Sequence, residues 1–126
     1  MGGLSNTARN LIAQMIAGEA YTAFNNANAY LGVGNSSTAY SAAHTDLQGA
    51  SKTRKAMDTG YPQRTDNAIT YRSTFTTAEA NYDWLEWGVF NDPAAGAMLC
   101  RKADNQGTKT SDYSWRLTSV VTMAIP

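Results

Sequence analysis

Residues 82–91, Tyr-Asp-Trp-Leu-Glu-Trp-Gly-Val-Phe-Asn, decide the fold class, because they place large aromatic rings on both sides of an extended segment. Side chains alternate along a strand, so Trp84, Glu86 and Phe90 are predicted to face one way and Trp87 the other. A strand that is apolar on both faces is expected inside a β-sandwich, with Trp87 fully buried. Glu86 would then be a buried carboxylate, and it is predicted to accept hydrogen bonds from a cross-strand arginine or from backbone amides.

Other segments have the same character. Residues 68–75 and 113–125 alternate between apolar and polar side chains, and shorter strands are predicted at 29–34, 51–57 and 97–101. Residues 35–50 are predicted to form a long loop, and residues 104–107 a turn. About six short strands without intervening helices indicate a mainly-β, antiparallel β-sandwich or jelly-roll-like fold. Its predicted core comprises Trp84, Trp87, Phe90, Ile69, Tyr71, Phe75, Trp115 and Leu117.

One short α-helix is predicted near the N-terminus. Its apolar residues repeat at spacings of three and four, and they are Leu4, Ala8, Leu11, Ile12, Met15 and Ile16. Ser5 or Asn6 can cap its start, and Gly18 is placed to end it. The apolar stripe either covers the protein's own sandwich or packs, as an arm, on a neighbouring subunit. We therefore expect one domain over residues 1–126, with a helix or arm at 1–18 and the sandwich at 28–126.

Composition excludes several function classes. Ten basic and ten acidic residues cancel, so no positive excess favours a nucleic acid or an anionic membrane. No apolar run approaches the roughly 20 residues that span a bilayer. The single cysteine, Cys100, cannot form an internal disulfide, which fits folding in a reducing cytoplasm. Low charge and abundant Thr, Ser and Asn instead favour close association with other protein.

No catalytic or ligand-binding motif stands out. One histidine and one cysteine are too few for a zinc site, and His44 near Asp46 lacks the sequence context of a hydrolytic triad. The pair Gly32 and Gly34 lacks the rest of a dinucleotide fingerprint and is attributed to turn geometry. We expect neither an enzyme nor a bound cofactor, metal or small-molecule substrate.

A cationic segment follows the predicted loop and could form a contact patch complementary to later acidic residues. Together with the helical stripe it gives the candidate contact residues for other subunits. These are Leu4, Leu11, Ile12, Met15, Lys52, Arg54 and Lys55. The alternative is a solvated surface of mixed charge.

Four blocks of the chain resemble a pattern in small virion proteins of tailed bacteriophages. These blocks are residues 30–34, residues 71–75 with 79–81, residues 86–91 and residues 97–101. Such proteins are β-sandwich or jelly-roll-like structural subunits, placed as capsid decoration (cement) proteins or as tail and fibre components. The resemblance provides no ligand residues to transfer to this chain.

From this resemblance and the composition we expect a virion protein on the outer capsid surface, made in the cytoplasm of the host bacterium. Its expected partners are the major capsid protein and copies of itself, most simply in a homotrimer that stabilises the shell. A tail, baseplate or fibre-tip subunit is the alternative.

Overall fold

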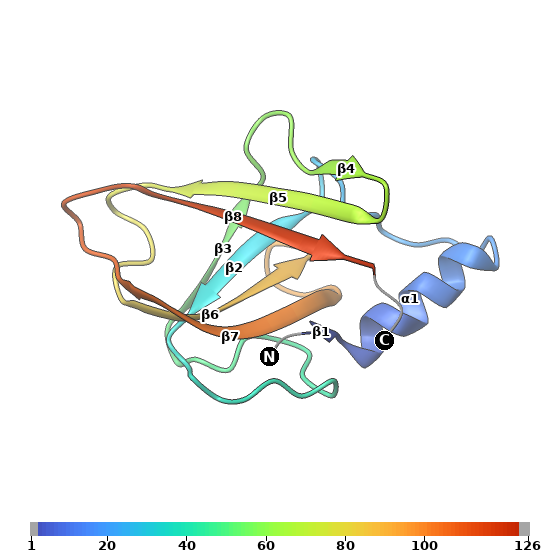
Figure 1. The fold of residues 1–126 in the computed structure, drawn as a ribbon, viewed down its shortest axis with the longest axis horizontal. Helices are drawn as coiled ribbons and strands as arrows, with labels where there is room; N and C mark the ends of the chain where they lie inside the picture. Colours follow the sequence, from blue (N-terminus) through green and yellow to red (C-terminus); the bar gives the residue numbers. More distant parts are fainter. Residues whose placement is uncertain (1–2, 124–126) are drawn as a thin grey trace.

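The structure, a computed structural model, describes residues 3–123, which form eight strands and one helix. The elements are β1 (Gly3–Leu4), α1 (Asn6–Ile16), β2 (Tyr30–Gly34), β3 (Lys52–Ala56), β4 (Gln63–Thr65), β5 (Ala68–Phe75), β6 (Asp83–Phe90), β7 (Met98–Thr108) and β8 (Trp115–Thr122). A five-stranded sheet has the order β1-β7-β6-β2-β3 and a three-stranded sheet the order β4-β5-β8, with antiparallel pairing throughout. The predicted antiparallel β-sandwich with one short helix is confirmed (Figure 1).

The core lies between the two sheets and is built around three aromatic rings. The ring of Trp84 packs edge to face against Phe75 and Trp115, with centroids 5.0 and 5.1 Å apart. β5 and β8 supply two of these rings because they pair in an unbroken register, which keeps one face of each strand turned inward. Of the predicted core residues, Tyr71, Phe75, Trp84, Phe90 and Leu117 are buried, whereas Ile69, Trp87 and Trp115 are half-buried and pack against the core.

The facing of side chains along β6 departs from regular alternation. Trp84 packs between the sheets, whereas Phe90 packs with Leu47 and Met98 in a smaller cluster. The prediction that Trp84 and Phe90 share a face is therefore wrong. The pairing of β6 with β7 is irregular between Trp84 and Glu86, so that residues 104–106 lie opposite Leu85 alone. Such a bulge re-aims neighbouring side chains, and here Trp84 faces the inter-sheet core.

β7 is longer than the sequence predicts, because the predicted turn at 104–107 is part of the strand. Gly107 adopts a left-handed φ of 99°, and its N–H donates to Asn105 Oδ1 at 3.0 Å. These turn-forming residues thus build the bulge in the ladder. β1 and β4 were not predicted, because two or three residues are too few to show a period. Since β1 pairs with β7, the sandwich also includes residues that precede the helix, and does not begin at residue 28.

The predicted long loop lies against the outer face of the five-stranded sheet, where it brings Leu47 onto Phe90. Gly32 and Gly34 make this approach possible. A Cβ at Gly32 would lie 2.8 Å from the Phe90 ring, and a Cβ at Gly34 would lie 2.3 Å from Glu86 Oε2. The prediction that these two glycines serve a turn is wrong, since they provide space inside a sheet.

α1 is attached firmly at its N-terminal end. The Oγ atom of Ser5 accepts the N–H of Ala8 at 3.0 Å and donates to the carbonyl of Met98 at 2.5 Å. Ser5 is fully buried, and Ala8 is the one buried residue of the helix. After Ala17, Gly18 takes a left-handed φ of 78° and ends the helix as predicted.

Candidate functional site

His44 and Asp46 do not form catalytic machinery. His44 Nδ1 accepts the N–H of Ser41 at 3.2 Å, and its ring lies edge-on to Tyr40. The Asp46 carboxylate pairs with Lys52 at 2.8 Å and Arg54 at 3.3 Å. His44 therefore bonds a backbone N–H, and the Asp46 carboxylate bonds two cationic side chains and not the histidine. This arrangement provides no relay toward a serine nucleophile.

Cys100 is also poorly suited to chemistry. Its thiol is buried, and this burial raises its pKa to about 12. The thiol is therefore protonated at neutral pH, and the thiolate is the reactive form. Within residues 3–123 no group of three or more His, Cys, Asp or Glu side chains is placed to hold a metal ion. In the same part of the chain, no helix has the length and apolar character needed to cross a membrane.

The Glu86 carboxylate, on the five-stranded sheet, accepts four hydrogen bonds. Its Oε1 accepts Arg101 Nε at 2.7 Å and the N–H of Gln48 at 2.8 Å, and its Oε2 accepts the N–H of Gly49 at 2.7 Å. The N–H of Ser36 approaches the same Oε2 at 3.3 Å. Both charged side chains are 0% exposed. The predicted partners of Glu86, a cross-strand arginine and backbone amides, are both present.

This cluster holds structure together and offers no open site. Glu86 on β6 ties both ends of the loop to the sheet, because Ser36 begins the loop and Gln48 and Gly49 end it. Two nitrogen atoms of Arg101, Nη1 and Nη2, have no hydrogen-bond partner among the described residues. Since a buried unpaired charge costs several kcal/mol, Arg101 depends on the carboxylate of Glu86.

The three cationic candidate residues of β3 are engaged within the chain. Lys52 pairs with Asp46, and Lys55 pairs with Glu79 at 2.9 Å. The Arg54 guanidinium stacks 3.7 Å from the Phe90 ring centroid and donates to the carbonyls of Asp92 and Ala95. The charges of this segment are therefore largely paired within the chain, and its contact with other subunits stays a prediction.

The candidate contact residues also do not form one surface. β3 lies at one edge of the five-stranded sheet, whereas β7, which α1 contacts, pairs with β1 at the other. Leu4 belongs to β1 and packs on the main core, so it is not part of the helical stripe. The predicted patch thus divides into a helical part and an internally paired strand.

The helical part is a surface in its own right. Leu11, Ile12 and Met15 are half-buried and lie outside both core clusters, and Ile16 is 84% exposed. Tyr21, which follows the helix, is 50% exposed. In Figure 1, α1 projects beyond the ends of the sheets. We call Leu11, Ile12, Met15 and Ile16 the helical face.

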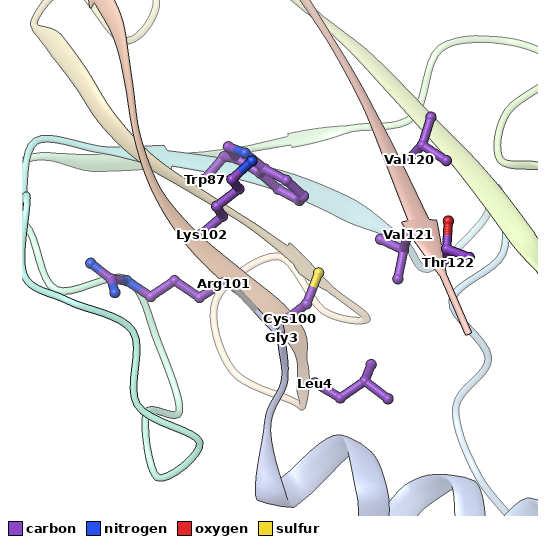
Figure 2. A pocket seen from close by; sticks show the side chains of 9 residues that line it. All are labelled: Gly3, Leu4, Trp87, Cys100, Arg101, Lys102, Val120, Val121 and Thr122. Carbon is purple, nitrogen blue, oxygen red and sulfur yellow. The ribbon is translucent and has the colours of Figure 1, made fainter. Parts of the chain in front are cut away.

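A second feature lies between β7 and β8, where the two sheets part. A cavity of about 290 Å³ opens there, and Leu4, Trp87, Cys100 and Val121 contribute apolar atoms to its walls (Figure 2). Trp87 is half-buried because it faces this cavity, so the prediction of a fully buried Trp87 is wrong. Farther along the same two strands is a second hollow, of about 570 Å³, with Trp84, Gln106 and Trp115 among its lining residues.

Sequence reasoning did not find this open side. The alternation of residues 113–125 predicts a strand with one buried face, but it does not indicate whether that strand lies at the edge of a sheet. Edge position depends on which strands pair, and that is set by contacts far apart in sequence. The apolar side chains beside the opening look like ordinary core residues in the sequence.

A scan against protein-family models, a search of curated proteins and a search of solved structures gave no significant match.

Proposed function

We propose that the chain is a structural subunit of a bacteriophage virion, and specifically a capsid decoration subunit that binds the outer shell and stabilises contacts between major capsid proteins. The proposal rests on the resemblance of four sequence blocks to virion proteins and on one structural observation. That observation is the helical face, an apolar stripe that lies outside both core clusters and ends in Ile16, which is 84% exposed. An assembly role accounts for such a stripe, and a catalytic role does not.

The energetics of α1 favour a partner on this stripe. An 11-residue helix is marginal in water by itself, since isolated helices shorter than about 12–15 residues seldom persist. α1 has no acidic residue in its first turn and no basic residue in its last, so charges add nothing to it. Ser5 and Ala8 are fully buried, whereas the apolar residues of the later turns are half-buried or exposed. Covering the helical face with another protein would stabilise the remaining turns by burying apolar surface.

The rest of the surface suits close association. The formal net charge is zero, and several charged side chains are paired within the chain, as in Lys52 with Asp46 and Lys55 with Glu79. Long-range repulsion between copies is therefore weak. A symmetric trimer is the simplest closed arrangement that repeats a modest contact three times on a shell, which raises binding through effective concentration.

Co-sedimentation with undecorated shells, assembled from the major capsid protein of the same phage, tests the proposal. Wild-type protein is expected to pellet with the shells. The double variant Met15→Gln, Ile16→Gln should lose most of this binding, because glutamine preserves helix propensity but removes the apolar contact. The double variant Asn10→Gln, Ala13→Gln alters exposed residues of the same helix and should bind like the wild type.

The melting temperature of each variant shows whether the fold is retained. Wild-type protein that ignores shells but pellets with tails would move the assignment to a tail or baseplate subunit. Equal shell binding by both double variants would show that the helical face is not the contact.

A further inference from the structure

β8 is the least protected edge strand in the described part of the chain. It pairs with β5 alone, over eight residues without a bulge, and carries one charged side chain, Arg116. The other sheet edges are protected in the usual ways. β1 and β4 are very short, β3 carries three cations, and the exposed part of β7 is bulged.

The backbone groups at this free edge can be identified. The N–H of Met123 donates to the carbonyl of Asn67 at 2.8 Å, which continues the ladder between β5 and β8. Because the direction of N–H and C=O groups alternates along a strand, the odd-numbered residues of β8 bond β5. The even-numbered residues direct their backbone groups to the free edge, and their side chains are all exposed. They are Arg116, Thr118, Val120 and Thr122.

We propose that two copies of the chain pair through β8 in antiparallel fashion, with a two-fold axis at Ser119. This register is the one that engages all four even-numbered residues of β8, since Thr118 pairs with Val120 of the other copy and Arg116 with Thr122. The three-stranded sheets of the two copies then form one continuous sheet. An unpaired edge strand is a ready template for such a contact.

The side chains are self-complementary in this register. On the inner face, Leu117 lies opposite Val121 of the other copy, and Ser119 lies opposite its own counterpart. On the outer face, Val120, which is 56% exposed, lies opposite Thr118. The two copies of Arg116 are far apart, so no like charges face each other across the pair. Shifting the register by two residues toward the N-terminus would place Leu117 opposite Ser119, and Thr122 would then lie opposite Ser114, which precedes β8.

The cavity between β7 and β8 adds a reason for a partner at this side. Its walls include Val120, Val121 and Thr122 together with Leu4 and Trp87 (Figure 2). A second β8 at the edge narrows the opening and shields these apolar atoms from water. The contact is separate from the helical face, so on a shell it would link subunits of neighbouring trimers.

Substituting proline at the edge tests the pairing. Val120→Pro removes an N–H that points to the free edge and leaves the ladder to β5 intact, because proline is tolerated where a strand faces solvent. Sedimentation equilibrium should give the wild type at least twice the mass of Val120→Pro. Val120→Thr, which keeps the N–H, should match the wild type. Equal masses for the wild type and Val120→Pro would overturn the proposal, as would equal dissociation by Val120→Thr.

Crosslinking gives a readout that does not depend on a proline. Residues 119 would form a non-hydrogen-bonded pair with Cα atoms about 4.5 Å apart, within disulfide range. Ser119→Cys should therefore yield a covalent dimer under mild oxidation. Arg116→Cys, which is more exposed, should crosslink poorly, and wild-type Cys100 is buried. Crosslinking of Arg116→Cys but not of Ser119→Cys would contradict the register. The crosslinking test is independent of the shell-binding test, because the variants of the helical face do not change β8.

Discussion

At the scale of residues, the fold depends on where a few large or charged side chains point. Trp84 and Trp87 differ by three positions and look equivalent in the sequence. The first is 2% exposed and packs on two other rings, whereas the second faces a cavity and is half-buried. The local irregularity opposite Leu85 accounts for the position of Trp84, and sequence periodicity contains no sign of it.

The two tryptophans should therefore differ in their effect on stability. Trp84→Ala is expected to cost about 3–5 kcal/mol of unfolding free energy, because it leaves a large cavity between the sheets. Trp87→Ala should cost clearly less, since solvent already reaches its ring. Urea denaturation of both variants measures the difference. Equal losses would show that Trp87 is as firmly packed as Trp84.

Acid should destabilise the protein partly through Glu79. The N–H of Thr76 donates to this carboxylate at 2.8 Å and, together with the Lys55 ammonium, lowers the pKa of Glu79 from 4.5 to about 2. A lowered folded-state pKa contributes stability that is complete above pH 4.5 and is lost as the pH falls toward 2.

Glu79→Gln should accordingly lose less stability than the wild type between pH 5 and pH 3, in a comparison of thermal unfolding at the two values. Asp83→Asn, on an exposed carboxylate of the next strand, provides a control. If the wild type and Glu79→Gln lost equal stability between pH 5 and pH 3, Glu79 would not contribute to acid destabilisation.

At the scale of elements, the sequence predicts the regular strands and the helix well, but it predicts turns, bulges and strand pairing poorly. β2, β3, β5, β6 and α1 lie within one or two residues of the expected ranges, because each has a clear period or a capping residue. The turn predicted at 104–107 became a bulge, because the same residue types serve both structures. The pairing of strands, which makes β8 an edge, depends on contacts that no local pattern encodes.

The long loop is expected to be held mainly by Glu86. Glu86→Gln removes the charge that Arg101 requires, and breaking a buried pair in this way should cost about 3–5 kcal/mol. Hydrogen exchange should speed up at the amides of Gln48 and Gly49, both of which donate to this carboxylate. The half-buried pair of Lys55 with Glu79 is a suitable comparison, because solvent screens it, and Glu79→Gln should cost about 1 kcal/mol or less at neutral pH.

Unchanged exchange at Gln48 and Gly49 in Glu86→Gln would show that apolar contacts of Leu47, and not the carboxylate, hold the loop. The double variant Glu86→Gln, Arg101→Met should recover part of the lost stability, since it removes both buried charges together.

At the scale of the whole molecule, the protein is a sandwich with two exposed features, the helical face and the β8 edge. The apolar stripe of the helix was predicted from sequence because amphipathic spacing is local, and its contact with other protein stays a prediction. The ion pairs of the β3 candidates were not predicted, because their carboxylate partners, Asp46 and Glu79, lie outside the strand and no pattern connects them. Both exposed features suit contact with other protein, which is the basis of the proposed role.

Locating the protein on phage particles tests the central proposal most directly. A cryo-electron microscopy map of the virion should show this sandwich on the outer surface of the shell, with the helical face against the major capsid protein. Density for the sandwich only in the tail, or a shell-bound copy with α1 turned away from the capsid protein, would contradict it.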